Sequence, residues 1–412
     1  MIVCKFGGTS VASKNGAKKI KEIVQLKSGR KIIVVSALGK DDLFNYKITD
    51  KLFELYYALC ENRPNKDIID EIFFRYETLS RFLNITINWS KYKSNLIKII
   101  SEKKYTKDFI VSRGEYYSAI LYSKFLNATF LDAKNYIKFD KQGKLNLYST
   151  KKLLKRLNTS KKYVIGGYYG SKSNGEICVF DRGGSDTTGA VISSCLNAEI
   201  YENYTDVTGV FNKNPNLFIN AKKLSILNYK TAIKMAKCGN EVVHSSAIKI
   251  MTESNGILLV KNTANPNVHG TIISSDQIDE EESLYICTNK IYLMCFKSIS
   301  KKTLDYLYSH SNILYIINSK NNYYVLAKNL YVPQQQIKSL INFKYISACT
   351  YFFFFSNRDK FNKNYLKNLN KLNKLNKNFI KLKSFCSYIN NFLLVVDDTI
   401  AQKAINIINH FK

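Results

Sequence analysis

The sequence has 412 residues, with 62 Lys and Arg against 32 Asp and Glu, so its formal net charge at pH 7 is +30. Hydrophobic residues make up 45% of the chain, which excludes a chain that is disordered throughout and can supply cores for about two or three domains. The basic residues are mostly Lys and are spread along the chain rather than gathered in an Arg-rich helix. We therefore interpret the charge as a solvated surface and expect no nucleic-acid partner.

Cysteine usage and apolar runs bear on the compartment. The nine cysteines include no Cys-x-x-Cys pair, and an odd number cannot close a complete disulfide framework. This favours a reducing compartment, so we predict a cytoplasmic protein. The N-terminal apolar run ends at Phe6, too short for a signal peptide, and the aromatic run Tyr351–Phe355 is far below the roughly 20 apolar residues that span a bilayer. We expect no membrane association.

The first elements predict an α/β domain of the doubly wound kind. A short apolar run, Ile2–Phe6, ends in Gly7-Gly8, and a helical pattern follows to about Leu26. The segment Lys31–Ala37 is a continuous β-branched run, typical of a strand covered on both faces. Strand, glycine turn, helix and strand in this order favour a parallel sheet with helices on both faces. Residues 41 to about 107 are predicted as a helical excursion from that core.

Strands and helices alternate through the rest of the chain. Strands are predicted at Lys162–Ile165, Ile177–Phe180, Glu199–Tyr204 and Ile257–Val260, and helices at Thr187–Leu196, Asn228–Ala236 and Glu241–Glu253. After an acidic stretch, strands are predicted at Tyr285–Phe296, Ile313–Ile317, Tyr323–Ala327, Ala348–Phe355 and Phe392–Val396. The low-complexity segment Asn357–Lys383 is predicted as a Lys- and Asn-coated surface helix. The C-terminal third is therefore expected to be α+β.

A lysine at the end of the first strand is followed by two glycines and two hydroxyl residues that open a helix, over Lys5–Ser10. Glycine lets the backbone approach a phosphate, successive N–H groups form an anion nest, and the helix terminus adds positive potential. Because the lysine precedes the glycines, this is not the Gly-x-x-x-x-Gly-Lys-Ser/Thr loop. Alone, the pattern is also compatible with an ordinary turn.

A second turn, within Asp181–Ala190, places Gly183 and Gly184 before a predicted N-cap, Ser185-Asp186. The neighbouring Arg182 can hold a carboxylate or phosphate through two parallel hydrogen bonds. The plain alternative is a capped helix with a surface arginine. Two such turns in one α/β domain favour a ligand site over that alternative.

Two further turns add polar residues. Ser112–Glu115 opens a helix with Glu115, which by itself could be an ordinary first-turn glutamate favoured by the helix dipole. Tyr204–Phe211 ends a strand in Thr205-Asp206 and turns at Gly209. Tyr201, Tyr204 and Phe211 are expected either in the core or in an adenine pocket.

In this order and spacing, the motifs resemble aspartokinase, the aspartate 4-kinase of the amino-acid kinase family. The matching segments are Lys5–Val11, Val34–Ala37, Gly114-Glu115, Arg182–Asp186, Thr205–Val210, Val242–His244 and Asn262–Pro266, within residues 1 to about 273. The resemblance implies an amino-acid kinase catalytic domain over residues 1–275, a linker over 276–283, and an ACT-like regulatory and dimerisation region over 284–412. It therefore implies a homodimer formed through the C-terminal region.

The reaction that the resemblance implies is ATP-dependent phosphorylation of the side-chain carboxylate of L-aspartate to 4-phospho-L-aspartate, the first step of lysine, threonine and methionine biosynthesis. Phosphoryl transfer needs positioning and cationic stabilisation more than a base, and a carboxylate acceptor is already ionised at neutral pH. The presence of only four His is therefore no objection. Mg²⁺ would be carried by ATP oxygens, and no metal site of the protein itself is expected.

The resemblance also implies roles for individual residues. Lys5 would bridge the transferring phosphoryl oxygens, and Asp186 would hold Lys5 in place. The substrate contacts would be Glu115 for the ammonium, Arg182 for the α-carboxylate, and Gly183, Gly184, Ser185 and Ser36. The ATP contacts would be Lys5, Phe6, Gly7, Gly8, Thr9, Ser10, Thr205, Asp206 and Phe211. His244 is expected to be structural, within a helix.

Some positions depart from the family pattern. Asp41-Asp42 stands where Thr-Thr-Asp is usual, Asn216 replaces an arginine, Phe211 replaces a tyrosine, and Glu241 replaces a lysine. These departures motivate an alternative, a weakened kinase homologue retained as an amino-acid-binding or scaffold protein. Kinases of glutamate, acetylglutamate, carbamate or UMP are a second alternative, which the extension past residue 280 argues against. Four site residues match the family pattern, which favours an active enzyme: Lys5, Asp186, Arg182 and Glu115.

One expectation concerns regulation. The resemblance places an effector loop at 296–302, where the family usually has a Gly-Phe-Leu-like turn with free backbone amides. This stretch contains no glycine. Without that turn we expect no effector pocket, and a ligand that binds the active and inactive states equally shifts no equilibrium between them. We therefore expect feedback inhibition by lysine or threonine to be weak or lost.

Overall fold

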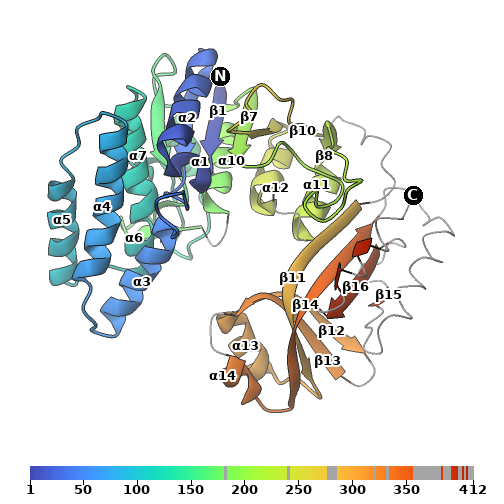
Figure 1. The fold of residues 1–412 in the computed structure, drawn as a ribbon. Helices are drawn as coiled ribbons and strands as arrows, with labels where there is room; N and C mark the ends of the chain where they lie inside the picture. The colour runs from blue at the N-terminus through green and yellow to red at the C-terminus, as the bar shows by residue number, and fades with distance from the viewer. Residues whose placement is uncertain are drawn as a thin grey trace. The chain divides into compact units, whose positions relative to one another are not determined.

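The computed structural model describes residues 1–180, 183–238, 242–275, 285–319, 322–330, 334–355, 382–383, 391–397, 401–402 and 405–406. The chain divides into two compact units (Figure 1). One comprises Met1–Val210, Leu224–Ala236 and Glu241–Glu280, and the other comprises Phe211–Lys223, Lys237–Asn240 and Glu281–Lys412. The two units are described separately below.

The first unit is built on an eight-stranded sheet in the order β3-β4-β2-β1-β7-β9-β10-β8. The strands are β1 (Ile2–Phe6), β2 (Arg30–Val35), β3 (Thr129–Leu131), β4 (Tyr163–Gly166), β7 (Ile200–Thr205), β8 (Ile226–Asn228), β9 (Ile257–Asn262) and β10 (Thr271–Ser274). All pairs from β3 to β9 are parallel. The predicted doubly wound α/β class is confirmed. The predicted strand at 177–180 also exists, but β6 (Ile177–Val179) pairs with β5 (Tyr169–Ser171) in a separate two-stranded sheet.

Helices join the parallel strands and cover the sheet (Figure 1). They are α1 (Gly8–Ala12), α2 (Lys14–Leu26), α3 (Ile48–Cys60), α4 (Lys66–Phe82), α5 (Trp89–Ser101), α6 (Lys107–Val111), α7 (Arg113–Phe125), α8 (Ala133–Tyr136), α9 (Leu147–Leu154), α10 (Gly184–Leu196), α11 (Tyr229–Lys237) and α12 (Ser245–Glu253). The helical excursion predicted after the second strand is present as α3 to α6. An aromatic cluster of Phe73, Tyr76, Trp89 and Tyr117 joins α4, α5 and α7.

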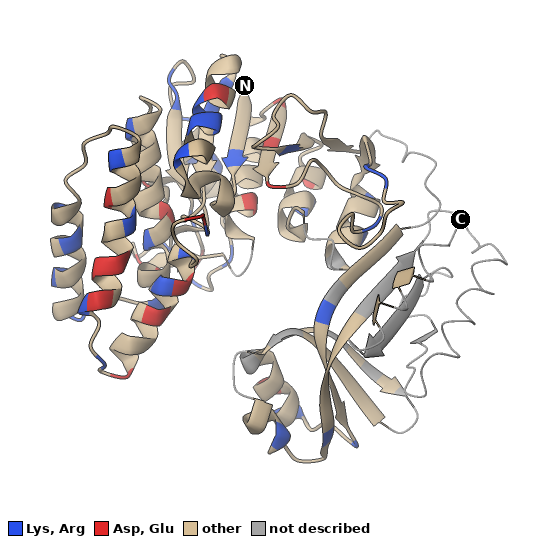
Figure 2. Cartoon of the chain, in the orientation of Figure 1, with Lys and Arg blue, Asp and Glu red and all other residues tan. Residues whose placement is uncertain are grey.

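Charged side chains of both signs coat this helical layer. Figure 2 shows Lys and Arg next to Asp and Glu on α3 and α4, whereas the charged residues of α5 are all Lys. Some of them pair, as in the ion pairs of Lys51 with Glu71 at 2.7 Å and of Lys93 with Asp70 at 2.8 Å. Exposed pairs of this kind add little to stability. Among the described residues, no helix has both the length and the hydropathy to cross a bilayer.

The second unit contains a six-stranded sheet in the order β12-β13-β11-β14-β16-β15. Its elements are β11 (Tyr285–Phe296), α13 (Lys301–His310), β12 (Ser311–Ser319), β13 (Asn322–Leu330), α14 (Gln334–Lys338), β14 (Phe343–Phe355), β15 (Leu382–Lys383) and β16 (Asn391–Asp397). From β11 to β14 the chain order is strand-helix-strand-strand-helix-strand, the ferredoxin-like arrangement. The α+β character predicted for this region is confirmed. Residues 211–223 belong to the same unit, where the Ile286 N–H donates to the Asn212 carbonyl at 2.8 Å.

Three local predictions are wrong. Leu382–Lys383 forms β15, paired with β16, so the surface helix predicted over Asn357–Lys383 does not extend to its end, and residues 357–381 lie outside the described residues. His244 is not inside a helix, because its extended backbone and its ring nitrogen cap α12, which begins at Ser245. Ser185-Asp186 is not an N-cap, since the left-handed Gly183 caps α10. The predicted linker at 276–283 lies outside the described residues.

Candidate active site

The carboxyl ends of five parallel strands lie at the same edge of the first unit's sheet. Gly7 follows β1, Ser36 follows β2, Gly167 follows β4, Asp206 follows β7 and Thr263 follows β9. In open parallel sheets, this edge is where ligands bind. Most of the residues singled out in the sequence therefore come together at one edge because of strand order, although they are far apart in the chain.

A buried ion pair lies at the centre of this edge. The Lys5 Nζ is 2.8 Å from the Asp186 Oδ1, and both side chains are more than four-fifths buried. Asp186 is in the first turn of α10, where the helix dipole favours a carboxylate. Burial by itself would raise the pKa of the Asp186 carboxyl, but Lys5 and hydrogen bonds from the His244 backbone and from Asn203 hold it below its usual value. The Asp186 carboxyl is therefore ionised at neutral pH.

The glycine turn after β1 lies directly against this lysine. A Cβ on Gly7 would be 3.5 Å from the Lys5 Nζ, and the Gly7 N–H donates to the Tyr204 carbonyl at 3.2 Å. Gly8 begins α1, so its N–H has no acceptor within the helix. The Gly39 N–H donates to the Gly8 carbonyl at 2.9 Å, and a Cβ on Gly39 would be 2.6 Å from the Gly8 backbone. The Gly7 amide is therefore used by β7, the Gly8 amide is the one without a helical acceptor, and Gly39 closes the carbonyl side of the turn.

The residues around the turn have distinct environments. Phe6 is fully buried and stacks on Tyr204 with ring centroids 4.9 Å apart, so both rings belong to the core. Thr9 is exposed, whereas the Ser10 hydroxyl is buried 2.6 Å from the Thr263 hydroxyl. Ser10 therefore joins α1 to the end of β9 through its side chain.

Glu115 is a second unusual carboxylate at this edge. Its side chain is in the first turn of α7 and the residue is only 4% exposed. Burial raises the pKa of the Glu115 carboxyl to about 8, although a hydrogen bond from the Ala37 N–H opposes this. Its Oε2 has no hydrogen-bond partner among the described residues. A buried carboxyl with an unused oxygen is prepared for a cationic ligand group, which would ionise it.

Close glycine contacts connect Glu115 to the α10 turn. A Cβ on Gly166 would be 2.7 Å from the Glu115 carbonyl, and a Cβ on Gly167 would be 2.6 Å from the Ser185 hydroxyl. Gly183 has a left-handed φ of +58° and lies against the His244 ring. Side chains at these positions would collide with the backbone or with neighbouring rings.

The turn after β7 is more exposed. Thr205 donates its hydroxyl hydrogen to the exposed Asp206 carboxylate at 3.0 Å, and the Thr205 carbonyl accepts from the Thr263 N–H at 2.9 Å. Phe211 belongs to the second unit, where it pairs with Lys223 in an isolated bridge. Arg182 and Glu241 lie outside the described residues.

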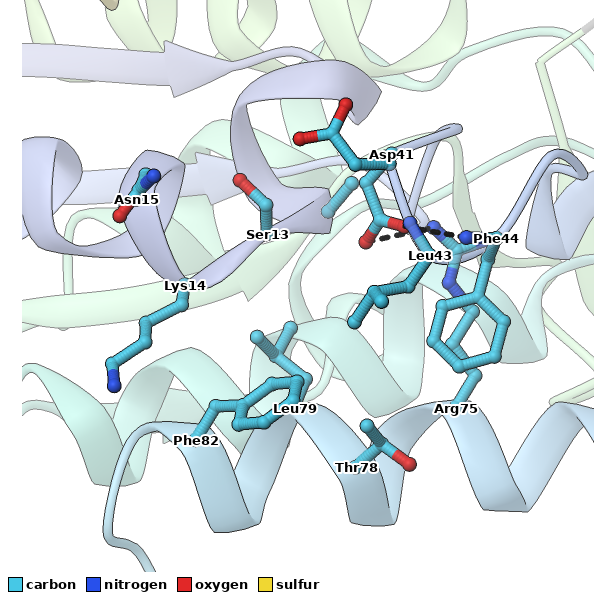
Figure 3. A pocket seen from close by; sticks show the side chains of 12 residues that line it. Ser13, Lys14, Asn15, Asp41, Leu43, Phe44, Arg75, Thr78, Leu79 and Phe82 are labelled. Carbon is cyan, nitrogen blue, oxygen red and sulfur yellow. Dashed lines mark hydrogen bonds and ion pairs between the residues drawn. The ribbon is translucent and has the colours of Figure 1, made fainter.

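A pocket of about 260 Å³ lies beside the loop that follows β2 (Figure 3). Its walls are the start of α2, the Asp41–Phe44 loop and one side of α4. Asp41, one of the departures from the family pattern, accepts from the Leu43 and Phe44 N–H groups at 3.0 and 2.8 Å. The buried Arg75 donates to the Gly39 carbonyl and is 3.7 Å from Asp41. Asp41 therefore shapes its own loop, and Arg75 ties that loop to α4.

Among the described residues, no group of three or more His, Cys, Asp and Glu side chains is arranged to hold a metal ion. Neither of the two carboxylates described above lies in such a group: Asp186 is paired with Lys5, and Glu115 is buried beside Ala37.

Comparisons with known proteins agree with this architecture. The profile of the amino acid kinase family matches residues 1–262. The chain therefore belongs to the amino acid kinase family.

Individual relatives show which members of the family the chain resembles. The chain is 28% identical over 289 residues to Aspartokinase 3 of Bacillus subtilis (strain 168), covering 67% of this chain but 64% of that protein, less than two thirds of its length. The crystal structure of Clostridium acetobutylicum aspartate kinase matches with a TM-score of 0.77 and 28% identity over 99% of both chains. E. coli aspartokinase III in complex with aspartate and ADP matches with a TM-score of 0.74 and 19% identity over 100% of both chains, a likeness of fold.

Two residues near this edge, Asn203 and Arg75, were not singled out in the sequence, whereas Thr263 belongs to the matching segment Asn262–Pro266 but was given no role. Asn203 donates to Asp186, Thr263 contacts Ser10, and Arg75 holds Gly39. For Asn203 a signal existed, because a polar Glu-Asn pair interrupts an otherwise apolar strand. For Arg75 none existed, since its partners are 29 and 36 residues away in the chain.

Proposed function

We propose that this chain is an ATP-dependent aspartate kinase that forms 4-phospho-L-aspartate. The observation that carries the proposal is the buried Lys5–Asp186 pair beside the Gly7 turn. It provides a fixed cation at the end of a parallel strand, where a phosphoryl group meets glycine backbone. The relatives named above support the choice of aspartate as acceptor, since they are aspartokinases and one was solved with aspartate and ADP.

Each residue has a physical task in this proposal. The Lys5 ammonium stabilises charge on the oxygens of the transferring phosphoryl group, and Asp186 keeps that ammonium in place. Glu115 receives the ammonium of aspartate, while Arg182 receives its α-carboxylate. Because the acceptor carboxylate is ionised at neutral pH, no general base is required. Mg²⁺ carried by the nucleotide neutralises phosphate charge.

The remaining assignments at the site rest on the resemblance of the motifs. Ser36, Gly183, Gly184 and Ser185 surround the substrate, with Ser185 adding a hydroxyl contact. Gly7, Gly8, Thr9, Ser10, Thr205 and Asp206 contact the nucleotide in this proposal, together with the backbone of Phe6, whose ring lies in the core, and with Phe211, which the resemblance alone assigns to it. The catalytic domain over 1–275, the linker over 276–283 and the ACT-like region over 284–412 complete the proposal, together with a homodimer formed through the C-terminal region and a cytoplasmic location.

The decisive experiment is a coupled assay of ADP release with and without L-aspartate. A second readout traps the acyl phosphate with hydroxylamine, because an acyl phosphate reacts to a hydroxamate and an ordinary phosphate ester does not. We expect both signals to require L-aspartate and to disappear when L-glutamate or UMP replaces it. ATP binding without aspartate-dependent ADP release would favour the scaffold alternative. Light scattering of the intact chain tests the dimer.

A further inference from the structure

A fully buried asparagine lies next to the proposed catalytic lysine. Asn203 on β7 is directly opposite Lys5 on β1 in the parallel register, and none of its surface is exposed. A buried amide that lacks hydrogen-bond partners costs folding free energy, so its partners explain its presence.

The Asn203 amide contacts both members of the ion pair. Its Nδ2 donates to the Asp186 Oδ1 at 3.0 Å, and its Oδ1 accepts from the Lys5 Nζ at 3.5 Å. The Nδ2 also lies 3.4 Å from the Tyr201 hydroxyl, which itself donates to the Asp186 carbonyl at 3.0 Å. The amide orientation matters, because a flipped amide would set N–H groups against the ammonium and oxygen against the carboxylate.

These contacts occupy two of the three donors of the Lys5 ammonium. An ammonium has three N–H donors. One points to Asp186 and one to Asn203, which leaves the third for a ligand at the Gly7 turn. With Asp186 alone, the ammonium could rotate about a single contact. The amide adds a second fixed point.

The opposite face of the same strands carries a separate buried polar network that does not involve Asn203. There, Glu202 forms a buried ion pair with Arg30 at 2.7 Å and also contacts Cys4. Successive strand residues point to opposite faces, so Asn203 and Lys5 share one face while Glu202 and Cys4 share the other. The polarity of Asn203 is directed at Lys5 and Asp186.

We propose that Asn203 is a positioning residue that fixes the orientation of the Lys5 ammonium and of the Asp186 carboxylate for phosphoryl transfer. The inference rests on the proposed function. It adds a residue that acts through Lys5 and Asp186 and does not itself touch substrate.

The test compares Asn203→Leu, which keeps the branched outline of four side-chain heavy atoms and removes the amide, with Val260→Ala. Val260 is the β9 partner of Asn203 in the register and is also fully buried, so it controls for lost packing in the same layer. We expect Asn203→Leu to lower kcat roughly ten- to a hundred-fold, as a small misplacement of a catalytic group does. The KM for aspartate should change less than kcat. Val260→Ala should lower the melting temperature while leaving kcat near that of the wild type.

A double-mutant comparison separates positioning from general damage. If Asn203 acts through the ion pair, Asn203→Leu should cost much less in the Asp186→Asn background than in the wild type. Full additivity would overturn the inference, and so would a wild-type kcat in folded Asn203→Leu. If Asn203→Leu does not fold, the isosteric Asn203→Asp, which cannot donate to Asp186 when ionised, serves instead. A wild-type kcat in that variant is equally contradictory.

A measurement that does not depend on catalysis tests the inference even if the proposed function is wrong. If the wild type releases no ADP with aspartate, carbon-13 NMR of the Asp186 carboxyl still reports the contact. The groups in contact with this carboxyl are Lys5, Asn203 and the His244 N–H, while the nearby Tyr201 hydroxyl donates to the Asp186 backbone carbonyl. Asn203→Leu should move its titration midpoint to higher pH, because a donor to the ionised form is lost. An unchanged midpoint would overturn the inference.

Discussion

Replacing Glu115 by Gln should abolish a pH dependence of the aspartate KM. Burial raises the pKa of the Glu115 carboxyl to about 8 in the free protein, and its Oε2 is unpaired among the described residues. Only the ionised form attracts the ammonium of aspartate, so the KM scales with one plus ten to the power of pKa minus pH. That factor is about 11 at pH 7 and about 1.3 at pH 8.5, an approximately eightfold fall in KM. The ammonium of the free amino acid stays protonated over this range.

The assay is ADP release at a series of aspartate concentrations and pH values, with ATP saturating. Glu115→Gln should raise the KM and make it independent of pH over the same range. A wild-type KM that does not change with pH would refute the assignment of Glu115. A variant with the same slope as the wild type would show that another group titrates.

The pH dependence of the free energy of unfolding gives an independent test of the same carboxyl. Its pKa is raised from an ordinary value of 4.5 to about 8, so between these values the folded protein binds more protons than the unfolded chain. The free energy of unfolding contributed by this group therefore falls as the pH rises from about 4.5 to about 8. Glu115→Gln should flatten that part of the stability curve in denaturant titrations, whatever the substrate is.

Three further outcomes are expected. Lys5→Ala should fold normally by circular dichroism but lose roughly a hundred- to a thousand-fold in turnover, because a charge contact to the transition state is removed; near-normal turnover would contradict the proposed role. Arg182→Lys should raise the KM for aspartate more than the KM for ATP, since a two-pronged carboxylate contact is lost; an equal rise would mean that Arg182 serves the nucleotide. Titration of L-lysine and L-threonine, separately and together, should inhibit weakly, because the Lys297 N–H already donates to the Asn342 carbonyl at 2.8 Å and the Ser300 oxygen caps α13. Cooperative inhibition below millimolar effector would show that this loop is a functional effector site.

The parallel sheet could be predicted from the sequence because its strands are continuous β-branched runs, as in Lys31–Ala37. Lys5 and Asp186 could be singled out because glycines mark the turns beside them. Asn203 was missed because its meaning depends on strand register, which places it opposite Lys5. The strand β15 was missed because a Lys- and Asn-rich composition does not show that two residues within it pair with β16.

The cap of α12 shows a related limit. The apolar spacing around His244 fits a helix, and only the contact of its ring with Gly183 and with Ser246 shows where the helix begins. The contact with Gly183 joins residues that are far apart in the chain, so the local sequence around His244 does not show it. Tertiary partners decide the ends of elements more than their middles.

The route of the chain through its two units limits how the protein can be divided. Residues 211–223 join the second unit before the chain returns to the first at Leu224. They are synthesised well before β11, whose Ile286 supplies the backbone contacts of Asn212 and Lys213. A fragment that ends at residue 275 would keep this segment and lack the strand it pairs with. On the ribosome, the segment likewise has to wait for β11 to emerge before it can pair.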